Sequence, residues 1–133
     1  MSGETDLDRL LAGMEPILHP GTYAFATLGA GALPPTITPR MTFREAEGMT
    51  VILLRQDAEA AGIACGFPSR MITLNVHSAL EAVGFLARIT TALAAEGIGV
   101  NPVAAFYHDH LFVPEDRAED ALAILRRLAA GPG

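Results

Sequence analysis

The fold is decided by residues 71–100, which read MITLNVHSALEAVGFLARITTALAAEGIGV. Over Met71–His77 apolar and polar side chains alternate, which is typical of a strand with one buried face. Over Leu80–Glu96 apolar residues recur at helical spacing and form a stripe wide enough to pack on a sheet. The stripe consists of Ala82, Phe85, Leu86, Ile89, Ala92 and Leu93. Gly97 follows the last helical residue, where a left-handed C-cap favours glycine, so the stretch predicts a strand and then a helix.

The sequence that follows adds two strands and a second helix. Ile98–Phe106 is a predicted strand, and Pro102 within it indicates a sheet edge or a bulge. Leu111–Val113 is the next strand, after a short turn over Tyr107–Asp109. A final helix is predicted over Glu115–Ala130, with acids in its first turn and arginines near its end, as the helix dipole favours. The order strand, helix, strand, strand, helix is the ferredoxin-like βαββαβ plan without its last strand.

The N-terminal half supplies further elements. A helix is predicted at Asp6–Met14, strands at Thr22–Leu28, Met41–Glu45 and Met49–Arg55, a helix at Gln56–Ala64, and a linker at Cys65–Arg70. We expect this half to provide the missing sheet edge, because it has strands to spare. The prediction is therefore an α+β protein with antiparallel sheets and two intertwined halves, residues 1–66 and residues 71–133.

Composition excludes several classes of protein. The chain has 133 residues, 50% of them hydrophobic, which fits one domain or two very small ones and excludes intrinsic disorder. Its net charge is -6 with no lysine, so it lacks the basic surface of nucleic-acid-binding or peripheral membrane proteins. A single cysteine, Cys65, excludes an internal disulfide and a cysteine-based zinc site. No apolar run approaches the roughly 20 residues of a membrane span, and we expect a cytoplasmic protein.

Four stretches of the sequence together resemble the ACT domain family. They are FREAEGMT (residues 43–50), TLNVHSALEAVG (73–84), FYHDHLFVP (106–114), and AVGFLARI (82–89) followed by GIGVN (97–101). The chain resembles bacterial stand-alone proteins with two ACT domains in tandem, and it is also similar to the ACT modules of aspartate kinases and of eukaryotic arginine sensors. The resemblance implies ferredoxin-like folds and a regulatory module that binds a small molecule, an amino acid, without catalysis or cofactor. It also implies a homodimer, with a possible enzyme partner in trans.

The junction after Met71–His77 carries the sharpest local signal. Ser78 and Glu81 have the spacing of a capping box, in which each side chain bonds the other's backbone amide and starts the helix. The functional alternative is that free amides at this helix start hold a ligand carboxylate. The ACT resemblance assigns ligand contacts here and at the start of the next strand. The assigned residues are Val76, His77, Ser78, Ala79, Leu80 and Asn101.

Two other interpretations stay open. His108 and His110 share a strand face and could chelate a metal, with His19, His77 or an acid as a third ligand. The simpler interpretation is a polar hairpin turn. We predict no metal site and no catalytic residue, although a small metal-dependent enzyme using His77, His108 and His110 is one hypothesis. The other hypothesis is a purely structural or oligomerisation module, which the high apolar content favours.

Overall fold

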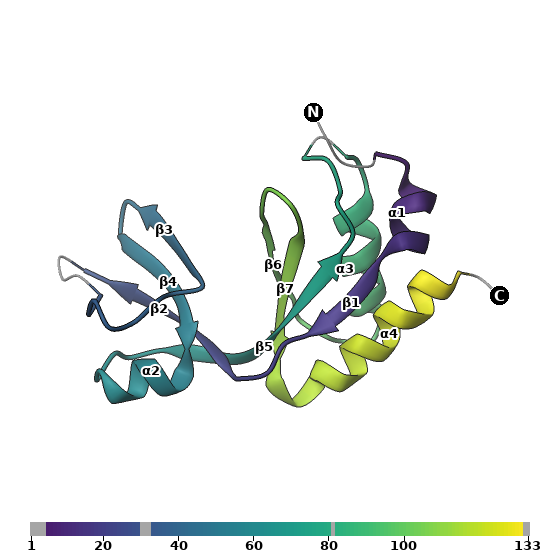
Figure 1. Ribbon diagram of the computed structural model, residues 1–133. Helices are drawn as coiled ribbons and strands as arrows, with labels where there is room; N and C mark the ends of the chain where they lie inside the picture. Colours follow the sequence, from purple (N-terminus) through teal and green to yellow (C-terminus); the bar gives the residue numbers. More distant parts are fainter. Residues whose placement is uncertain (1–4, 30–32, 81, 132–133) are drawn as a thin grey trace. The chain divides into compact units, whose positions relative to one another are not determined.

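A computed structural model describes residues 5–29, 33–80 and 82–131 of the chain (Figure 1). The helices are α1 (Leu7–Gly13), α2 (Arg55–Ala60), α3 (Phe85–Ala95) and α4 (Ala118–Ala130), the last preceded by a 3-10 turn, η1 (Glu115–Arg117). The strands are β1 (Glu15–Leu18), β2 (Tyr23–Leu28), β3 (Met41–Glu45), β4 (Gly48–Leu54), β5 (Gly66–Asn75), β6 (Asn101–Ala104) and β7 (Asp109–Pro114). They form two compact units, one from Met1–Pro20 with Arg70–Gly133 and the other from Gly21–Ser69.

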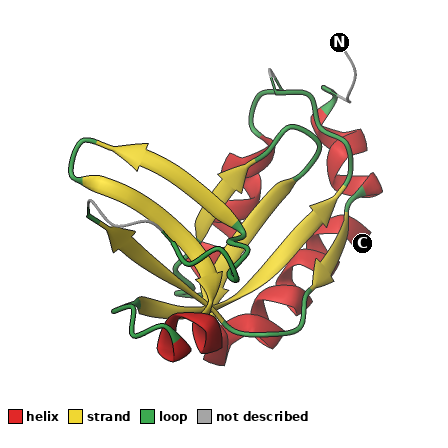
Figure 2. Ribbon diagram, turned by 60° about the vertical axis from the view of Figure 1, so that its left-hand side comes forward, coloured by secondary structure: helices red, strands yellow, loops and turns green. Residues whose placement is uncertain are grey.

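The first unit has the ferredoxin-like arrangement that the sequence predicts. Its strands lie in the order β1-β5-β7-β6, and β1 pairs antiparallel with β5, Ile17 opposite Thr73. The N-terminal segment therefore supplies the missing fourth strand. At the other end of this order, β6 pairs with β7 and sets Pro102 opposite Leu111, which confirms the edge position of that proline. Figure 2 shows the helices of this unit, in red, on one side of its strands.

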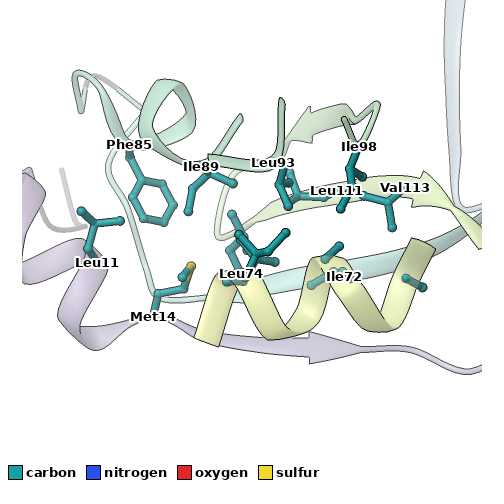
Figure 3. Packing of buried hydrophobic residues seen from close by; sticks show 14 of the residues in the cluster. Leu11, Met14, Ile72, Leu74, Phe85, Ile89, Leu93, Ile98, Leu111 and Val113 are labelled. Atoms are coloured by element: carbon teal, nitrogen blue, oxygen red, sulfur yellow. The ribbon is translucent and has the colours of Figure 1, made fainter. Parts of the chain in front are cut away.

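The core of the first unit lies between its helices and its sheet (Figure 3). Its buried members are Leu10, Leu11, Met14, Ile72, Leu74, Phe85, Ile89, Leu93, Ile98, Leu111, Val113, Ala118, Ala121, Ile124 and Leu125. α1 contributes Leu10 and Leu11 to this core. Asp6 caps the helix, accepting a hydrogen bond of 3.0 Å from the amide of Arg9. The predicted stripes of both long helices are thus the faces that the molecule buries.

The end of α3 follows the predicted glycine cap. Gly97 has a φ of +74°, and its amide donates to the carbonyl of Ala94, while the amide of Ile98 donates to Leu93. This pair of bonds is a Schellman motif. The same motif at Gly62 and Ile63 ends α2 at Ala60, so the predicted extension of that helix to Ala64 is wrong.

The second unit is a small antiparallel sheet with one short helix. β2 pairs with β4, β4 with β3, and β2 with the first residues of β5. The continuous apolar run Val51–Leu53 is fully buried, as expected for a strand covered on both faces. Val51 and Leu53 pack with Ala26 and with Ala58 from α2.

The predicted linker at Cys65–Arg70 is wrong, because β5 starts at Gly66 and runs through it. Phe67 adopts a φ of +55° at an irregular stretch of pairing, and its ring meets Phe25 edge-on at 5.6 Å. Ser69 is buried and donates to the carbonyl of Tyr23. These contacts are with residues more than forty positions away, so local glycine and proline signals gave the wrong assignment. Cys65 itself is only partly buried.

Candidate functional site

The segment between β5 and α3 is a loop of nine residues, longer than the sequence predicted. α3 begins at Phe85 rather than Leu80, with Gly84 as its N-cap at a φ of +90° and no side-chain cap. Before it, the amide of Ala82 donates to the carbonyl of Ala79 at 3.0 Å and closes a separate turn. Glu81 lies outside the described residues, so the structure does not place the predicted capping box. Ser78 instead directs its hydroxyl to Asp109.

A cavity of about 150 Å³ is lined by residues of this loop, of the first turn of α3 and of the β6–β7 hairpin. Most of its walls are small residues, which leave space that larger side chains would fill. The lining residues are Ser78, Ala79, Leu80, Ala82, Gly84, Phe85, Leu86, Ala87, Ala104, Ala105 and Asp109. Sites for drug-sized ligands measure roughly 300–1,000 Å³, so this cavity suits a small metabolite.

Asp109 gives the cavity its charge. The residue is 8% exposed, and the Ser78 hydroxyl donates to its Oδ2 at 3.4 Å. Burial raises the pKa of Asp109 above its ordinary value of 3.8, while the Ser78 hydrogen bond and the nearby charge of His108 act in the opposite direction. A carboxyl group that is buried at the wall of a cavity is a candidate for pairing with a cationic group.

The sequence places Asp109 in a predicted turn and not among the candidate ligand contacts. The structure starts β7 at this residue, and strand alternation puts it on the same side as Leu111 and Val113, which belong to the core. An acid in phase with two core residues was the signal that could have found it.

The predicted ligand-contact residues fall into two groups. Ser78, Ala79 and Leu80 line the cavity together with Asp109. Val76, His77 and Asn101 are not among the described residues that line it. Val76 is partly buried against the core, and its carbonyl oxygen lies 3.4 Å from His108 Nδ1. The ring of His77 lies 5.5 Å from the ring of Tyr107, centroid to centroid. Asn101 is exposed at the start of β6.

His110 faces the sheet surface of the first unit and not this cavity. Its Nδ1 lies 2.9 Å from the Thr73 hydroxyl, and His19 Nε2 lies 2.7 Å from the same oxygen. The three side chains thereby connect β7, β5 and the residue after β1. Within the described ranges, no three histidine, cysteine, aspartate or glutamate side chains come together to hold a metal ion.

Exposed apolar side chains stand on the two loops that border the cavity. Leu80 and Val83 precede α3, and Phe106 and Tyr107 form the tip of the β6–β7 hairpin. Phe106 and Tyr107 meet edge-on with ring centroids 5.0 Å apart. Exposed apolar residues that gather in this way mark a surface that binds a ligand or a partner.

The comparisons with known proteins agree with this fold. Two family models, each described as ACT domain, match residues 2–70 and 66–127. A crystal structure of a Vibrio cholerae protein of unknown function, described as a possible transport protein, is 43% identical, with a TM-score of 0.83 over 92% of this chain and 95% of that one. No curated protein matches the chain.

More distant structures share the fold alone. An Agrobacterium tumefaciens protein is 19% identical, with a TM-score of 0.74 over 87% of this chain and 89% of that one. The ligand-free regulatory subunit of aspartate kinase from Thermus thermophilus is 13% identical, with a TM-score of 0.66 over 85% and 95%. None of the described helices has the length and apolar character needed to cross a membrane.

Proposed function

Because the chain belongs to the ACT domain family, with two such domains in tandem, we propose that it is a regulatory module that binds an amino acid and has no catalytic activity. The proposed domains, residues 1–66 and 71–133 along the chain, are intertwined, since Met1–Pro20 lies in one compact unit with Arg70–Gly133. The bound state acts as a signal, because a ligand shifts a conformational equilibrium through its different affinity for the two states. The module works in the cytoplasm as a homodimer and acts in trans on an enzyme.

One observation supports the site: a buried carboxylate and an uncapped helix start border the same small cavity. An α-amino acid carries an ammonium and a carboxylate on one carbon. Asp109 accepts hydrogen bonds from the ammonium, which also offsets the cost of burying the charge of Asp109. The amides in the first turn of α3 receive the carboxylate, since that end of a helix is electropositive.

The predicted contact residues take defined places in this site. Ser78 orients Asp109 through its hydroxyl, and Ala79 and Leu80 form the wall beside it. Val76 and His77 hold the loop at its β5 end, through the contacts with His108 and Tyr107. Asn101, at the start of β6, is a further proposed contact to the ligand.

The test is isothermal titration calorimetry of the full chain against the twenty amino acids, with thermal shift as a first screen. We expect one or a few amino acids to bind. The N-acetyl derivative of the best ligand, which lacks the ammonium, and its decarboxylated amine should each bind at least tenfold more weakly. The absence of binding by every amino acid at millimolar concentration would contradict the proposal, as would undiminished binding of the N-acetyl derivative.

A second function, that of an assembly module without a ligand, is favoured by the exposed apolar tip residues Phe106 and Tyr107. In that case Phe106→Ser and Tyr107→Ser change the assembly state, and the calorimetric titrations give no heat. The two functions therefore separate in the same set of measurements.

A further inference from the structure

The size of the cavity beside Asp109 limits the side chain of any amino acid that binds there. The cavity measures about 150 Å³, which is the volume of about five water molecules at ~30 Å³ each. The ammonium, the α-carbon and the carboxylate, which every α-amino acid carries, take up most of this space. Because bonded atoms lie closer together than neighbouring water molecules, the rest holds a side chain of about one to three carbon atoms.

The cavity wall next to the Asp109 carboxylate carries a methyl group. Ala104 lies directly opposite Asp109 in the register of β6 and β7, and residues that are opposite each other in an antiparallel pair point to the same face of the sheet. Both residues line the cavity. An ammonium that binds Asp109 therefore brings its α-carbon close to Ala104, and the size of residue 104 limits the space for the ligand's side chain.

The lining residues offer an apolar surface to that side chain. Asp109 and Ser78 are the polar side chains among the described lining residues, and the Ser78 hydroxyl donates to Asp109. The other lining residues are alanine, glycine, leucine and phenylalanine. A hydroxyl or charged group on the ligand's side chain would lose its hydrogen bonds to water without a replacement from these residues, which disfavours binding. A second carboxylate would also be repelled by Asp109.

Leu80 is a large side chain of the cavity wall that lies outside the core. It is 59% exposed, whereas Phe85 is buried in the core and Leu86 packs against that core. Shortening Leu80 therefore enlarges the cavity and leaves the core intact.

Building on the proposed function, we infer that the ligand is an amino acid with a short aliphatic side chain, alanine above all, and that Leu80 and Ala104 determine this specificity. The methyl group of alanine fills space that glycine leaves empty. The side chains of leucine and arginine exceed the cavity. Serine and aspartate introduce polar groups that the lining side chains do not satisfy.

The test is isothermal titration calorimetry of the full chain with glycine, alanine, leucine, serine, aspartate and arginine. Alanine should bind about fourfold more tightly than glycine, because one further methyl group is buried, and it should bind more tightly than serine. Leucine, aspartate and arginine should each bind about tenfold or more weakly than alanine. Leu80→Ala should raise the affinity for leucine about tenfold or more, and Ala104→Val should lower the affinity for alanine by a similar factor while affecting glycine less.

Phe43→Ala on β3 is the matched control, because it shortens another exposed apolar side chain, one that does not line the cavity, and it should keep the wild-type order of affinities. Circular dichroism establishes that each variant is folded, and the wild-type series decides the side-chain preference by itself. Tightest binding of leucine, arginine or aspartate, with the N-acetyl derivative still weak, would overturn this inference and leave the proposed function standing. An unchanged order of affinities in both folded variants would overturn the role of Leu80 and Ala104. The absence of binding by every amino acid would contradict both proposals.

Discussion

Replacing Asp109 by asparagine tests the chemistry of the proposed site most directly. Asparagine keeps the size of the side chain and an oxygen that can accept the hydrogen bond from Ser78, but it removes the negative charge. A hydrogen bond to a charged group contributes about 1.5–3 kcal/mol. We therefore expect Asp109→Asn to weaken amino-acid binding about 10- to 150-fold, since about 1.4 kcal/mol corresponds to a factor of ten.

The same substitution should act on the stability of the ligand-free protein in the opposite direction. The pKa of Asp109 is raised in the folded state, mainly by burial, so the folded protein keeps this proton to higher pH than the unfolded chain does. The contribution of Asp109 to folding stability is therefore fully present below its ordinary pKa of 3.8, and it is lost as the pH rises through the raised pKa. Asp109→Asn should remove this decline and leave the protein at least as stable at pH 7.

Calorimetric titration with the amino acid at several pH values tests whether the charge of Asp109 governs affinity. Affinity in wild type should fall as the pH drops through the raised pKa of Asp109, because the protonated acid no longer attracts the ammonium. In Asp109→Asn this pH dependence should disappear. Asp116→Asn, an exposed acid in η1, is the control and should retain wild-type binding. Equal affinity in Asp109→Asn and wild type would refute the role given to this carboxylate.

Three further substitutions test the cavity, the core and one turn. Ala87→Leu places a larger side chain at the cavity wall and should lower amino-acid affinity in calorimetry, while thermal unfolding changes little because the residue is exposed on a helix. Leu93→Ala removes a fully buried side chain of α3 and should lower the free energy of unfolding by about 2–5 kcal/mol in urea titration; a loss below about 1 kcal/mol would mean that α3 packs differently. Gly48→Ala should lower the free energy of unfolding by more than about 1 kcal/mol in the same titration, since Gly48 has a φ of +152° and a Cβ would lie 2.7 Å from the Leu28 carbonyl oxygen. The control Gly99→Ala should leave stability unchanged, because a Cβ at Gly99 would have nothing within 4 Å.

The parts of the fold that local patterns determine were predictable. The stripes of α3 and α4 and the alternation over Met71–His77 specified which faces are buried, and the glycine at position 97 specified where α3 ends. The missing strand of the βαββαβ plan even indicated that the N-terminal segment had to contribute one, which β1 does. These features follow from periodicity and backbone preference, which a single sequence carries.

The errors occur where distant residues decide the local conformation. β5 continues through a glycine and a proline because Phe25 and Tyr23, far away in sequence, contact Phe67 and Ser69. In the structure, the length of the β6–β7 hairpin fixes the start of β7 at Asp109. A sequence defines such a strand boundary only within a few residues, so the predicted turn includes Asp109.

α3 begins at Phe85, five residues later than the predicted start at Leu80, and this difference bears on the proposed ligand site. A helix that began at Leu80 with a Ser78 cap would have consumed its first amides within the chain. The helix instead begins at Phe85, after a glycine that offers no side chain, so its first amides have no cap. Ser78 bonds Asp109 in place of a backbone amide, and the nine-residue loop leaves a cavity between them and α3. A weakly specified helix start is hard to predict, and in our proposal the carboxylate of the bound amino acid satisfies the amides that Gly84 leaves without a side-chain cap.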